Sequence, residues 1–437
     1  MASNTVQGQD TGGCPVSGHG KIDLSKMTLA DPEILAHPNE FYKAVRTEDP
    51  MHYDEKLGMY LVSRYEDLQT VLRDPITFSV KKGFSAQYAK GYQEELKEIL
   101  KREAGGFFEE AIMTDPPEHT RVRRLLDGAF TAHRVKELEP AIVALCADLV
   151  EKLLEKGEAE IFSDFAVPMT SAIICEQLGV DLPSETIQRW TISFTNQVSR
   201  MTNREDFEEL TKDLVELQKF IIEQINDRKE NPKEDMISDL VHVRAEGEEN
   251  PMLTFGETVG LCRALLIAGN ETTATALTGM FFILATRPDL AEFLYQNVND
   301  DKVVTRFVEE ALRYDPPVRG LTRMVTEDTE VGGVKLPKGA HLLLLYGSAN
   351  DDETQFPCPR KFDVERTNVG RHLAFGGGVH RCPGAPLARM ELKVAAREII
   401  TRMDNIKLAI PLEEITYQQS VATHTISNLK LTFSRRA

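Results

Sequence analysis

The stretch His372 to Arg389, HLAFGGGVHRCPGAPLAR, places three consecutive glycines and a cysteine just before a helical pattern. Consecutive glycines permit positive φ angles and a close approach of the backbone to another group. Pro383 and Pro386 suit the first turn of a helix, where the missing N–H costs no hydrogen bond. We therefore expect Cys382 to lie where a tight glycine loop enters a helix that spans Ala385 to Met403.

This position of Cys382 favours metal ligation by its sulfur. The partial positive charge and free N–H groups of a helix N-terminus stabilise a thiolate, which is the form that binds metal. Zinc requires several protein ligands, whereas one thiolate beside an open, flat space suits haem iron. The alternative interpretation is a structural cysteine buried on a glycine turn, which is the common state of a free cysteine.

The pattern from Phe375 to Gly384, F-G-x-G-x-H-x-C-x-G, resembles the haem-binding loop of the cytochrome P450 family, the haem-thiolate monooxygenases. The resemblance runs from about residue 30 to the C-terminus. It implies the cytochrome P450 fold, a single large domain that is mainly α with a minor β portion. It also implies haem b (iron protoporphyrin IX), bound through Cys382 and the loop residues Phe375, His380 and Gly384.

Composition limits the possible partners and location. The chain has 437 residues, and 51 Lys and Arg against 69 Asp and Glu give a net charge of −18. This charge argues against nucleic acid, whose phosphates need a basic field, and against an anionic membrane surface. The six cysteines form no C-x-x-C pair, which fits a reducing compartment. Because the N-terminus is polar and no apolar run could span a bilayer, we expect a soluble, cytoplasmic protein.

The patterns along the chain predict one domain that follows a short arm. Residues 1–20 indicate a flexible N-terminal arm, and residues 21–437 form the predicted haem domain. Nearly all of the chain from residue 118 to 280 is helical in period. Alternating apolar residues predict strands, first as a hairpin and then as short or tail strands, at Met51–Ser63, Thr329–Val334, Leu342–Leu345 and Ile415–Ser434.

A long buried helix is predicted after Thr254. Thr254-x-x-Glu257 matches a capping box, and an apolar helical pattern continues to about Thr286. Its middle, residues 268–273, reads AGNETT, and glycine and asparagine weaken a helix. A threonine hydroxyl can also bond back to the carbonyl four residues earlier, here from Thr272 to Ala268. Taken alone, this is a polar notch that is satisfied locally.

The same string resembles the A-G-x-(D/E)-T-T segment that crosses the oxygen-binding face of the haem in the family. The resemblance places Ala268 and Gly269 against the cofactor and implies that Thr272 donates a hydrogen bond to iron-bound dioxygen. It implies that Glu271 brings protons from solvent. A positioned alcohol beside an acid suits a site that must receive two protons while excluding water.

Glu310 and Arg313 are i, i+3 on a predicted helix and can form an ion pair. Such a pair is usually exposed and contributes little to stability. In the family the E-x-x-R pair is instead buried and joined by a downstream arginine, which Arg366 matches here. The resemblance therefore implies a structural trio that supports the cysteine loop.

The two haem propionates need cations or hydrogen-bond donors. His119 and Arg123, in the segment DPPEHTRVR, lie one helical turn apart and can reach one propionate. Arg323 and His372 match two further family positions. Each of the four, considered alone, is equally compatible with an ordinary surface cation.

The resemblance implies insertion of one oxygen atom from O2 into a hydrophobic small molecule, with electrons from a separate redox partner. Because the chain contains no flavin or iron–sulfur module, we expect a ferredoxin-type donor with its own reductase, and we expect the enzyme to act as a monomer. The donor would dock on a basic patch beside the cysteine loop, formed by Arg121, Arg124, Arg134, Arg381, Arg389 and Lys393.

Three alternatives remain open at this point: a peroxide-using peroxygenase, a non-catalytic haem protein that binds a ligand, and a haem-free helical protein. The Glu271–Thr272 pair argues against the first two, since neither needs a proton relay. Apolar and aromatic stretches predict a hydrophobic substrate. Arg319 can pair with a substrate carboxylate, although a structural or surface role is favoured.

Overall fold

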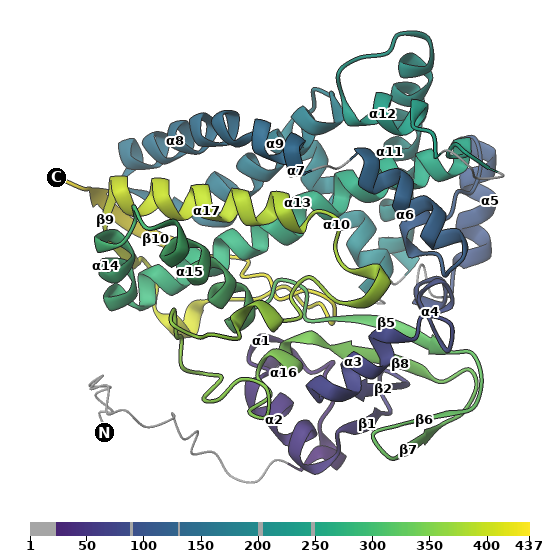
Figure 1. The fold of residues 1–437 in the computed structure, drawn as a ribbon, viewed down its shortest axis with the longest axis horizontal. Helices are drawn as coiled ribbons and strands as arrows, with labels where there is room; N and C mark the ends of the chain where they lie inside the picture. The colour runs from purple at the N-terminus through teal and green to yellow at the C-terminus, as the bar shows by residue number, and fades with distance from the viewer. Residues whose placement is uncertain (1–22, 88–90, 130–131, 200–203, 246–249) are drawn as a thin grey trace.

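The computed structural model describes residues 23–437 apart from 88–90, 130–131, 200–203 and 246–249. The arm predicted for residues 1–20 lies outside the described residues. Figure 1 shows a large helical part with a smaller sheet-containing part beneath it. The predicted fold class, a single mainly α domain with a minor β portion, is confirmed.

Helices follow one another closely from residue 118 onward, as their periodicity predicted. The helices are α1 (Pro32–Ala36), α2 (Asn39–Glu48), α3 (Tyr65–Arg73), α4 (Val80–Gln87), α5 (Gln93–Glu103), α6 (Glu118–Ala129), α7 (Ala132–Glu137), α8 (Glu139–Lys156), α9 (Val167–Leu178), α10 (Ser184–Ser199), α11 (Arg204–Glu230), α12 (Met236–His242), α13 (Phe255–Thr286), α14 (Pro288–Gln296), α15 (Asp301–Tyr314), α16 (Tyr346–Asn350) and α17 (Ala385–Arg402).

The strands form a five-stranded sheet in the order β1-β2-β8-β5-β3, a three-stranded sheet in the order β4-β10-β9, and the hairpin β6-β7. In the larger sheet β2 and β8 are parallel and the other neighbours are antiparallel. The strands are β1 (Met51–Asp54), β2 (Met59–Val62), β3 (Phe78–Ser79), β4 (Glu158–Glu160), β5 (Gly320–Val325), β6 (Thr329–Val331), β7 (Val334–Leu336), β8 (His341–Leu345), β9 (Met403–Leu408) and β10 (Lys430–Arg435).

The predicted hairpin at residues 51–63 is confirmed, but two other strand predictions are wrong. Thr329–Val334 is not one strand, because Gly332 and Gly333 have positive φ and turn the chain back as a two-residue hairpin loop. In the tail, Lys430–Arg435 is a strand, whereas 415–429 makes isolated bridges. Here Ser420 Oγ accepts hydrogen bonds from the N–H groups of Ala422 and Thr423, and this local turn replaces a ladder.

Helix α13 occupies the centre of the helical part and packs against α9, α10, α11, α15 and α17 (Figure 1). The predicted capping box is confirmed, because Thr254 and Glu257 exchange side-chain to backbone hydrogen bonds in both directions. The helix contributes to two large apolar clusters, one shared with α8, α15 and α17 and the other with α10 to α12. Its position makes α13 the scaffold against which the remaining helices are fixed.

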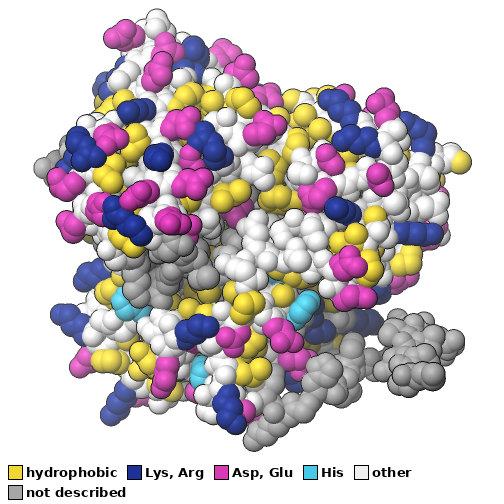
Figure 2. Space-filling view, turned by 180° about the vertical axis from the view of Figure 1, so that it is seen from behind, with side chains coloured by type: hydrophobic (Ala, Val, Ile, Leu, Met, Phe, Trp, Pro, Cys, Tyr) yellow, Lys and Arg dark blue, Asp and Glu magenta, His cyan; other side chains and the backbone are white. Residues whose placement is uncertain are grey.

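The surface is charged but mixed in sign. Figure 2 shows acidic and basic side chains interspersed over one face, with hydrophobic side chains scattered between them. Among the described helices, none has both the length and the apolar character of a membrane span.

Candidate functional site

The cysteine loop is shaped by glycines that no other residue could replace. Gly376 and Gly378 have φ of 66° and 64°, in the left-handed region. A Cβ on Gly378 would lie 2.1 Å from the carbonyl oxygen of Leu72, at the end of α3. The Cys382 N–H donates to the carbonyl of Phe375 at 3.0 Å and closes the loop. Cys382 therefore lies three residues before α17, where the sequence predicted it.

The fold adds an influence on the Cys382 sulfur that the sequence did not reveal. Burial raises the pKa of the Cys382 thiol, and it outweighs the N–H groups of Gly384 and Ala385 and the charges of Arg123 and Arg389, which act to lower it. The helix N-terminus alone therefore does not keep the sulfur ionised, because the buried site disfavours a free charge. A coordinated metal cation removes the proton from a thiol ligand outright.

Helix α13 leaves one stripe of its surface open although it lies at the centre of the fold. Ala268 is exposed, and Ala264, Leu265, Gly269 and Thr272 are partly exposed, while the residues between them are buried. These residues recur at helical spacing and share one face. An open stripe on a central helix indicates space for a group that is not part of the chain.

The polar notch of α13 has the predicted local bond. Thr272 Oγ1 donates to the Ala268 carbonyl at 2.8 Å, which confirms the predicted back-bond. In this conformation the Thr272 oxygen can accept a hydrogen bond from another group. The hydroxyl can donate to another group only if it rotates and gives up its bond to the Ala268 carbonyl.

The acid beside Thr272 has a partner that the sequence did not reveal. Glu271 Oε2 accepts a hydrogen bond from Thr195 Oγ1 of α10 at 2.6 Å. Burial raises the pKa of Glu271, and the Thr195 bond acts against this. Thr195 stands in no motif, and its contact with Glu271 spans 76 positions, so no sequence signal identified it.

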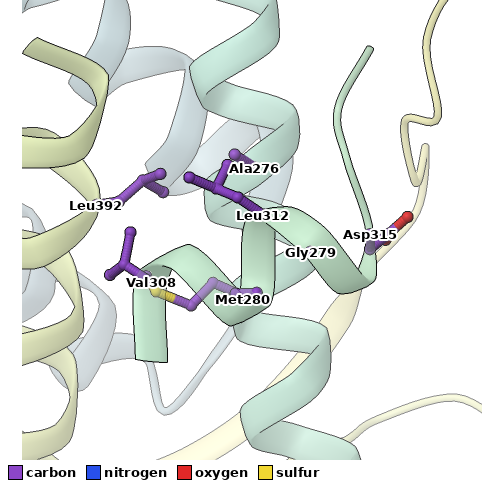
Figure 3. Close-up of a pocket in the computed structure, with 8 residues that line it drawn as sticks. Ala276, Gly279, Met280, Val308, Leu312, Asp315 and Leu392 are labelled. Atoms are coloured by element: carbon purple, nitrogen blue, oxygen red, sulfur yellow. The ribbon is translucent and has the colours of Figure 1, made fainter. Parts of the chain in front are cut away.

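A small packing gap lies one turn further along α13, where α13, α15 and α17 meet. Figure 3 shows Met280, Val308, Leu312 and Leu392 around this gap. Its volume is about 10 Å³, which is room for one water molecule at most. The gap is therefore too small for a substrate or cofactor.

Three of the four residues predicted to hold propionates lie in buried surroundings near the cysteine loop. His119 is 1% exposed, and neither of its ring nitrogens has a partner among the described residues. Its ring lies 4.0 Å, centroid to centroid, from that of His380, whose Nε2 donates to the Thr114 carbonyl. Burial and the neighbouring His380 lower the pKa of His119 to about 4.

The two arginines predicted to hold propionates, Arg123 and Arg323, each donate a hydrogen bond to a backbone carbonyl. Arg123 Nη1 donates to the Arg381 carbonyl at 2.6 Å, next to Cys382, and the buried Arg323 donates Nη1 to the Thr322 carbonyl. Buried polar atoms almost always have hydrogen-bond partners. The unpartnered imidazole of His119, flanked by Arg123, therefore fits an anionic group that the chain itself does not supply.

His372 does not join this set, which corrects the prediction. Its Nε2 lies 3.0 Å from Glu309 Oε2, and its Nδ1 accepts from the Ala374 N–H. Arg389 of α17 binds the same carboxylate at 2.6 and 2.9 Å. Although burial acts to raise it, hydrogen bonds from Arg389 and His372 bring the pKa of Glu309 to about 2. His372 thus ties the cysteine loop to α15 and has no nitrogen left for a propionate.

Glu310, Arg313 and Arg366 form a buried cluster beneath the loop. Arg313 donates two hydrogen bonds of 2.8 and 2.9 Å to the Glu310 carboxylate. Arg366 Nε lies 3.2 Å from both oxygens of the same carboxylate. The remaining N–H groups of the two arginines donate to backbone carbonyls of residues 350–361. The cluster therefore fixes the irregular segment that leads into the cysteine loop.

The predicted basic patch is largely neutralised by ion pairs. Arg121 pairs with Glu257, Arg389 with Glu309, and Lys393 with Asp301. Arg124 and Arg381 are exposed, and the side chain of Arg134 lies outside the described residues. The partners come from distant parts of the chain, so the sequence could not exclude them.

Arg319 is buried and has the structural role that the sequence favoured over contact with a substrate. It is 1% exposed and donates Nε to the Thr423 carbonyl at 2.9 Å. Burial lowers its pKa, while nearby Tyr42 and Asp315 act to raise it. Because the guanidinium is closed off from solvent, it links β5 to the tail rather than facing an open site.

Comparison with known proteins places these features in context. The sequence profile described as Cytochrome P450 matches residues 90–408. The chain is 32% identical over 387 residues to Cytochrome P450 109 of Bacillus spizizenii, covering 86% of this chain and 87% of that protein. It is 30% identical over 397 residues to 6-deoxyerythronolide B hydroxylase of Saccharopolyspora erythraea, covering 89% and 94%.

A solved structure has the same fold. Cytochrome P450 CYP109Q5 from Chondromyces apiculatus superposes with a TM-score of 0.82 at 30% identity, covering 95% of this chain and all of that one.

Proposed function

Because this chain belongs to the cytochrome P450 family, we propose that it inserts one oxygen atom from O2 into a hydrophobic small molecule by hydroxylation. The chain is a haem-b-dependent monooxygenase that uses O2 and a redox partner. When bound, the haem would supply the oxygen-activating chemistry, and the Cys382 thiolate would promote it by pushing electron density toward the iron. The observation that carries the proposal is the glycine loop that presents Cys382 at the start of α17.

The protein contacts of the cofactor divide between two sides. Cys382 would hold the iron, with Phe375, His380 and Gly384 around it on the loop side. Ala268 and Gly269 of the open stripe on α13 would cover the other side. The propionates are held by His119, Arg123, Arg323 and His380, and the unpartnered imidazole of His119 supports this assignment.

Thr272 and Glu271 supply protons on the α13 side. Burial raises the pKa of the Glu271 carboxyl, so this group holds a proton more readily than an exposed acid. The Glu271 carboxyl can then release that proton to the Thr272 hydroxyl, which holds the proton in position for delivery. This assignment favours O2 over hydrogen peroxide as oxidant, since peroxide carries its own protons.

The substrate is an apolar compound of moderate size. Leu321, in a central strand of the sheet, is 37% exposed, and Leu265, Val318 and Val421 are also partly exposed. Apolar side chains left open in the interior of a fold are typical of a ligand site. The hydroxylase relative from Saccharopolyspora erythraea supports hydroxylation as the reaction.

The electron donor is a ferredoxin-type protein with its own reductase. Arg124 and Arg381 are exposed members of the predicted patch, and Val379, 46% exposed, lies two positions before Arg381 in the cysteine loop. An exposed apolar residue close to a cation suits an acidic partner that binds transiently. The enzyme acts as a monomer in this proposal.

The Soret band of the reduced protein with carbon monoxide tests the proposal. We expect the strong red shift that thiolate ligation produces, and we expect Cys382→Ser to abolish it. Cys358→Ser, which changes a second partly buried cysteine outside the loop, should leave the shift intact. A shift that survives in Cys382→Ser, or that is absent from the unaltered protein, would contradict thiolate ligation by Cys382.

A second measurement separates the monooxygenase from a peroxygenase. A panel of terpenoids, steroids, fatty acids and aromatic compounds is first scored by conversion of the ferric haem to high spin. The best compound is then incubated either with NADH, ferredoxin and reductase, or with hydrogen peroxide. Product formed with peroxide at the higher rate would favour the peroxygenase instead.

A further inference from the structure

The two polar residues that enter the middle of α13 differ in how they are satisfied. Asn270 is 1% exposed, and its Oδ1 accepts from Thr170 Oγ1 at 2.6 Å and Ser171 Oγ at 3.1 Å, both buried on α9. Its neighbour Glu271 is bonded instead to Thr195, which is only partly buried. Asn270 is thus anchored in the interior, whereas Glu271 is bonded to a hydroxyl that is not fully enclosed by the fold.

Helix α10 carries this contact to the edge of the molecule. Ser193 and Asn196, neighbours of Thr195 on α10, line a hollow of about 490 Å³ between α10 and α11 that is open to solvent. The solvent-open hollow therefore begins at the residues that precede Thr195 by two positions and follow it by one. A hydroxyl can accept one hydrogen bond while it donates another, so it can pass a proton on.

We propose that Thr195 is the relay residue through which solvent protons reach Glu271. A hydronium ion of the solvent gives a proton to Thr195 Oγ1 while the proton of Thr195 moves to Glu271 Oε2. The hydroxyl of Thr195 is thereby regenerated, a water molecule is left in the solvent, and Glu271 changes from a carboxylate to a neutral acid that holds the proton for Thr272. The inference rests on the proposed role of Glu271 and adds the residue that connects it to water.

The geometry gives this path a structural condition. Glu271 belongs to α13 and Thr195 to α10, so the hydrogen bond exists only while the two helices are packed together. The path is therefore assembled by the docking of α10 on α13. A departure of α10 would break it and leave Glu271 without its connection.

Helix α10 also offers a matched control. Thr191 lies one turn before Thr195, is 2% exposed, and its Oγ1 has no partner among the described residues. Thr191→Val and Thr195→Val make the same change on the same helix. Replacing an unsatisfied buried hydroxyl with a methyl group is close to neutral for stability.

The first test follows the proton on Glu271 directly in the resting protein. The infrared C=O stretch of the protonated acid, assigned by its loss in Glu271→Gln, is monitored during exchange from H2O to D2O. We expect Thr195→Val to slow this exchange on the order of a hundredfold, the lower range for a positioned proton-transfer group. Thr195→Ser should restore it, and Thr191→Val should match the unaltered protein.

The second test measures hydrogen peroxide formed per NADH consumed by the reconstituted enzyme without added substrate. Loss of the relay diverts electrons from water to peroxide, so Thr195→Val should raise the ratio severalfold and Thr195→Ser should not. An unchanged exchange rate and peroxide ratio in Thr195→Val, with a raised peroxide ratio in Glu271→Gln and Thr272→Ala, would overturn the inference and leave the proposed function standing. An unchanged peroxide ratio in all three variants would instead overturn the proton role of Glu271 itself.

Discussion

The two sides of the proposed haem site differ in how completely the chain satisfies its own polar groups. On the cysteine side, Glu310 holds Arg313 and Arg366, Glu309 holds Arg389 and His372, and the loop closes through Cys382 N and Phe375 O. On the α13 side, Glu271 has a contact with the partly buried Thr195, and Thr272 bonds only within its own helix turn.

This difference indicates that the cysteine side supports the structure, whereas the α13 side carries out proton transfer. A network whose members are all paired is rigid and has one arrangement, which suits a ligand loop that must not move. Groups with few partners remain free to exchange protons or bind an added group. We therefore expect substitutions on the cysteine side to act on stability, and substitutions on the α13 side to act on proton delivery with little change in stability.

The largest effect should come from the buried trio. Arg313→Ala removes the two hydrogen bonds that Arg313 donates to Glu310 and leaves Arg366 as the one cation bonded to that carboxylate among the described residues. Breaking a buried pair in this way costs about 3–5 kcal/mol. Urea unfolding, followed by circular dichroism, should show this loss, and haem incorporation should fall with it. The exposed pair of Arg287 and Asp289 is the control, since Asp289→Ala should cost about 0–1 kcal/mol. Equal costs in the two variants would contradict the supporting role of the trio.

A smaller, pH-dependent effect is expected at Glu309. Its folded-state pKa of about 2 lies below the ordinary value of 4.5. The ionised carboxylate therefore contributes its full stabilisation at pH values above 4.5. This stability is lost as the pH falls from about 4.5 toward 2, and it amounts to about 3 kcal/mol. The free energy of unfolding should therefore lose part of its pH dependence in this window in Glu309→Gln. The exposed Glu413→Gln should keep the full dependence, and the same slope in Glu309→Gln would show that this ion pair contributes nothing.

The smallest effect on stability is expected on the α13 side. Thr272→Ala removes one hydroxyl bonded within its own helix, so the free energy of unfolding should change by about 1 kcal/mol or less. The carbon monoxide spectrum should not change, because Cys382 is untouched. Peroxide formed per NADH should nevertheless rise severalfold. A large loss of stability with normal coupling would reverse the comparison between the two sides.

Local chemistry made much of the site predictable. The capping box at Thr254, the glycine loop before α17 and the back-bond of Thr272 each involve residues within a few positions of one another. Such features depend on side-chain type and on backbone freedom, both of which can be read from a short stretch of sequence. The pairing of Glu310 with Arg313 belongs to the same class, since i, i+3 spacing on a helix suffices.

The errors share one cause, which is competition among distant partners. His372 was expected to face a propionate, but Glu309 lies 63 positions earlier in the chain and takes its Nε2. Arg121 was expected to remain free, but Glu257 at the start of α13 pairs with it. Burial likewise raises the pKa of the Cys382 thiol when no metal is bound, an influence that the sequence did not reveal. Each outcome depends on which groups the fold brings together and how far it excludes water.

The sequence by itself determined the fold class, the position of the sulfur at a helix start and the polar notch in a long buried helix, because these depend on composition, periodicity and near-neighbour chemistry. Only the tertiary structure decided that Glu271 reaches Thr195, that His372 holds the loop to α15, and that His119 remains buried without a partner. The physical reason is that a hydrogen bond or ion pair forms with whichever group packing places within about 3 Å, and packing is a property of the whole chain.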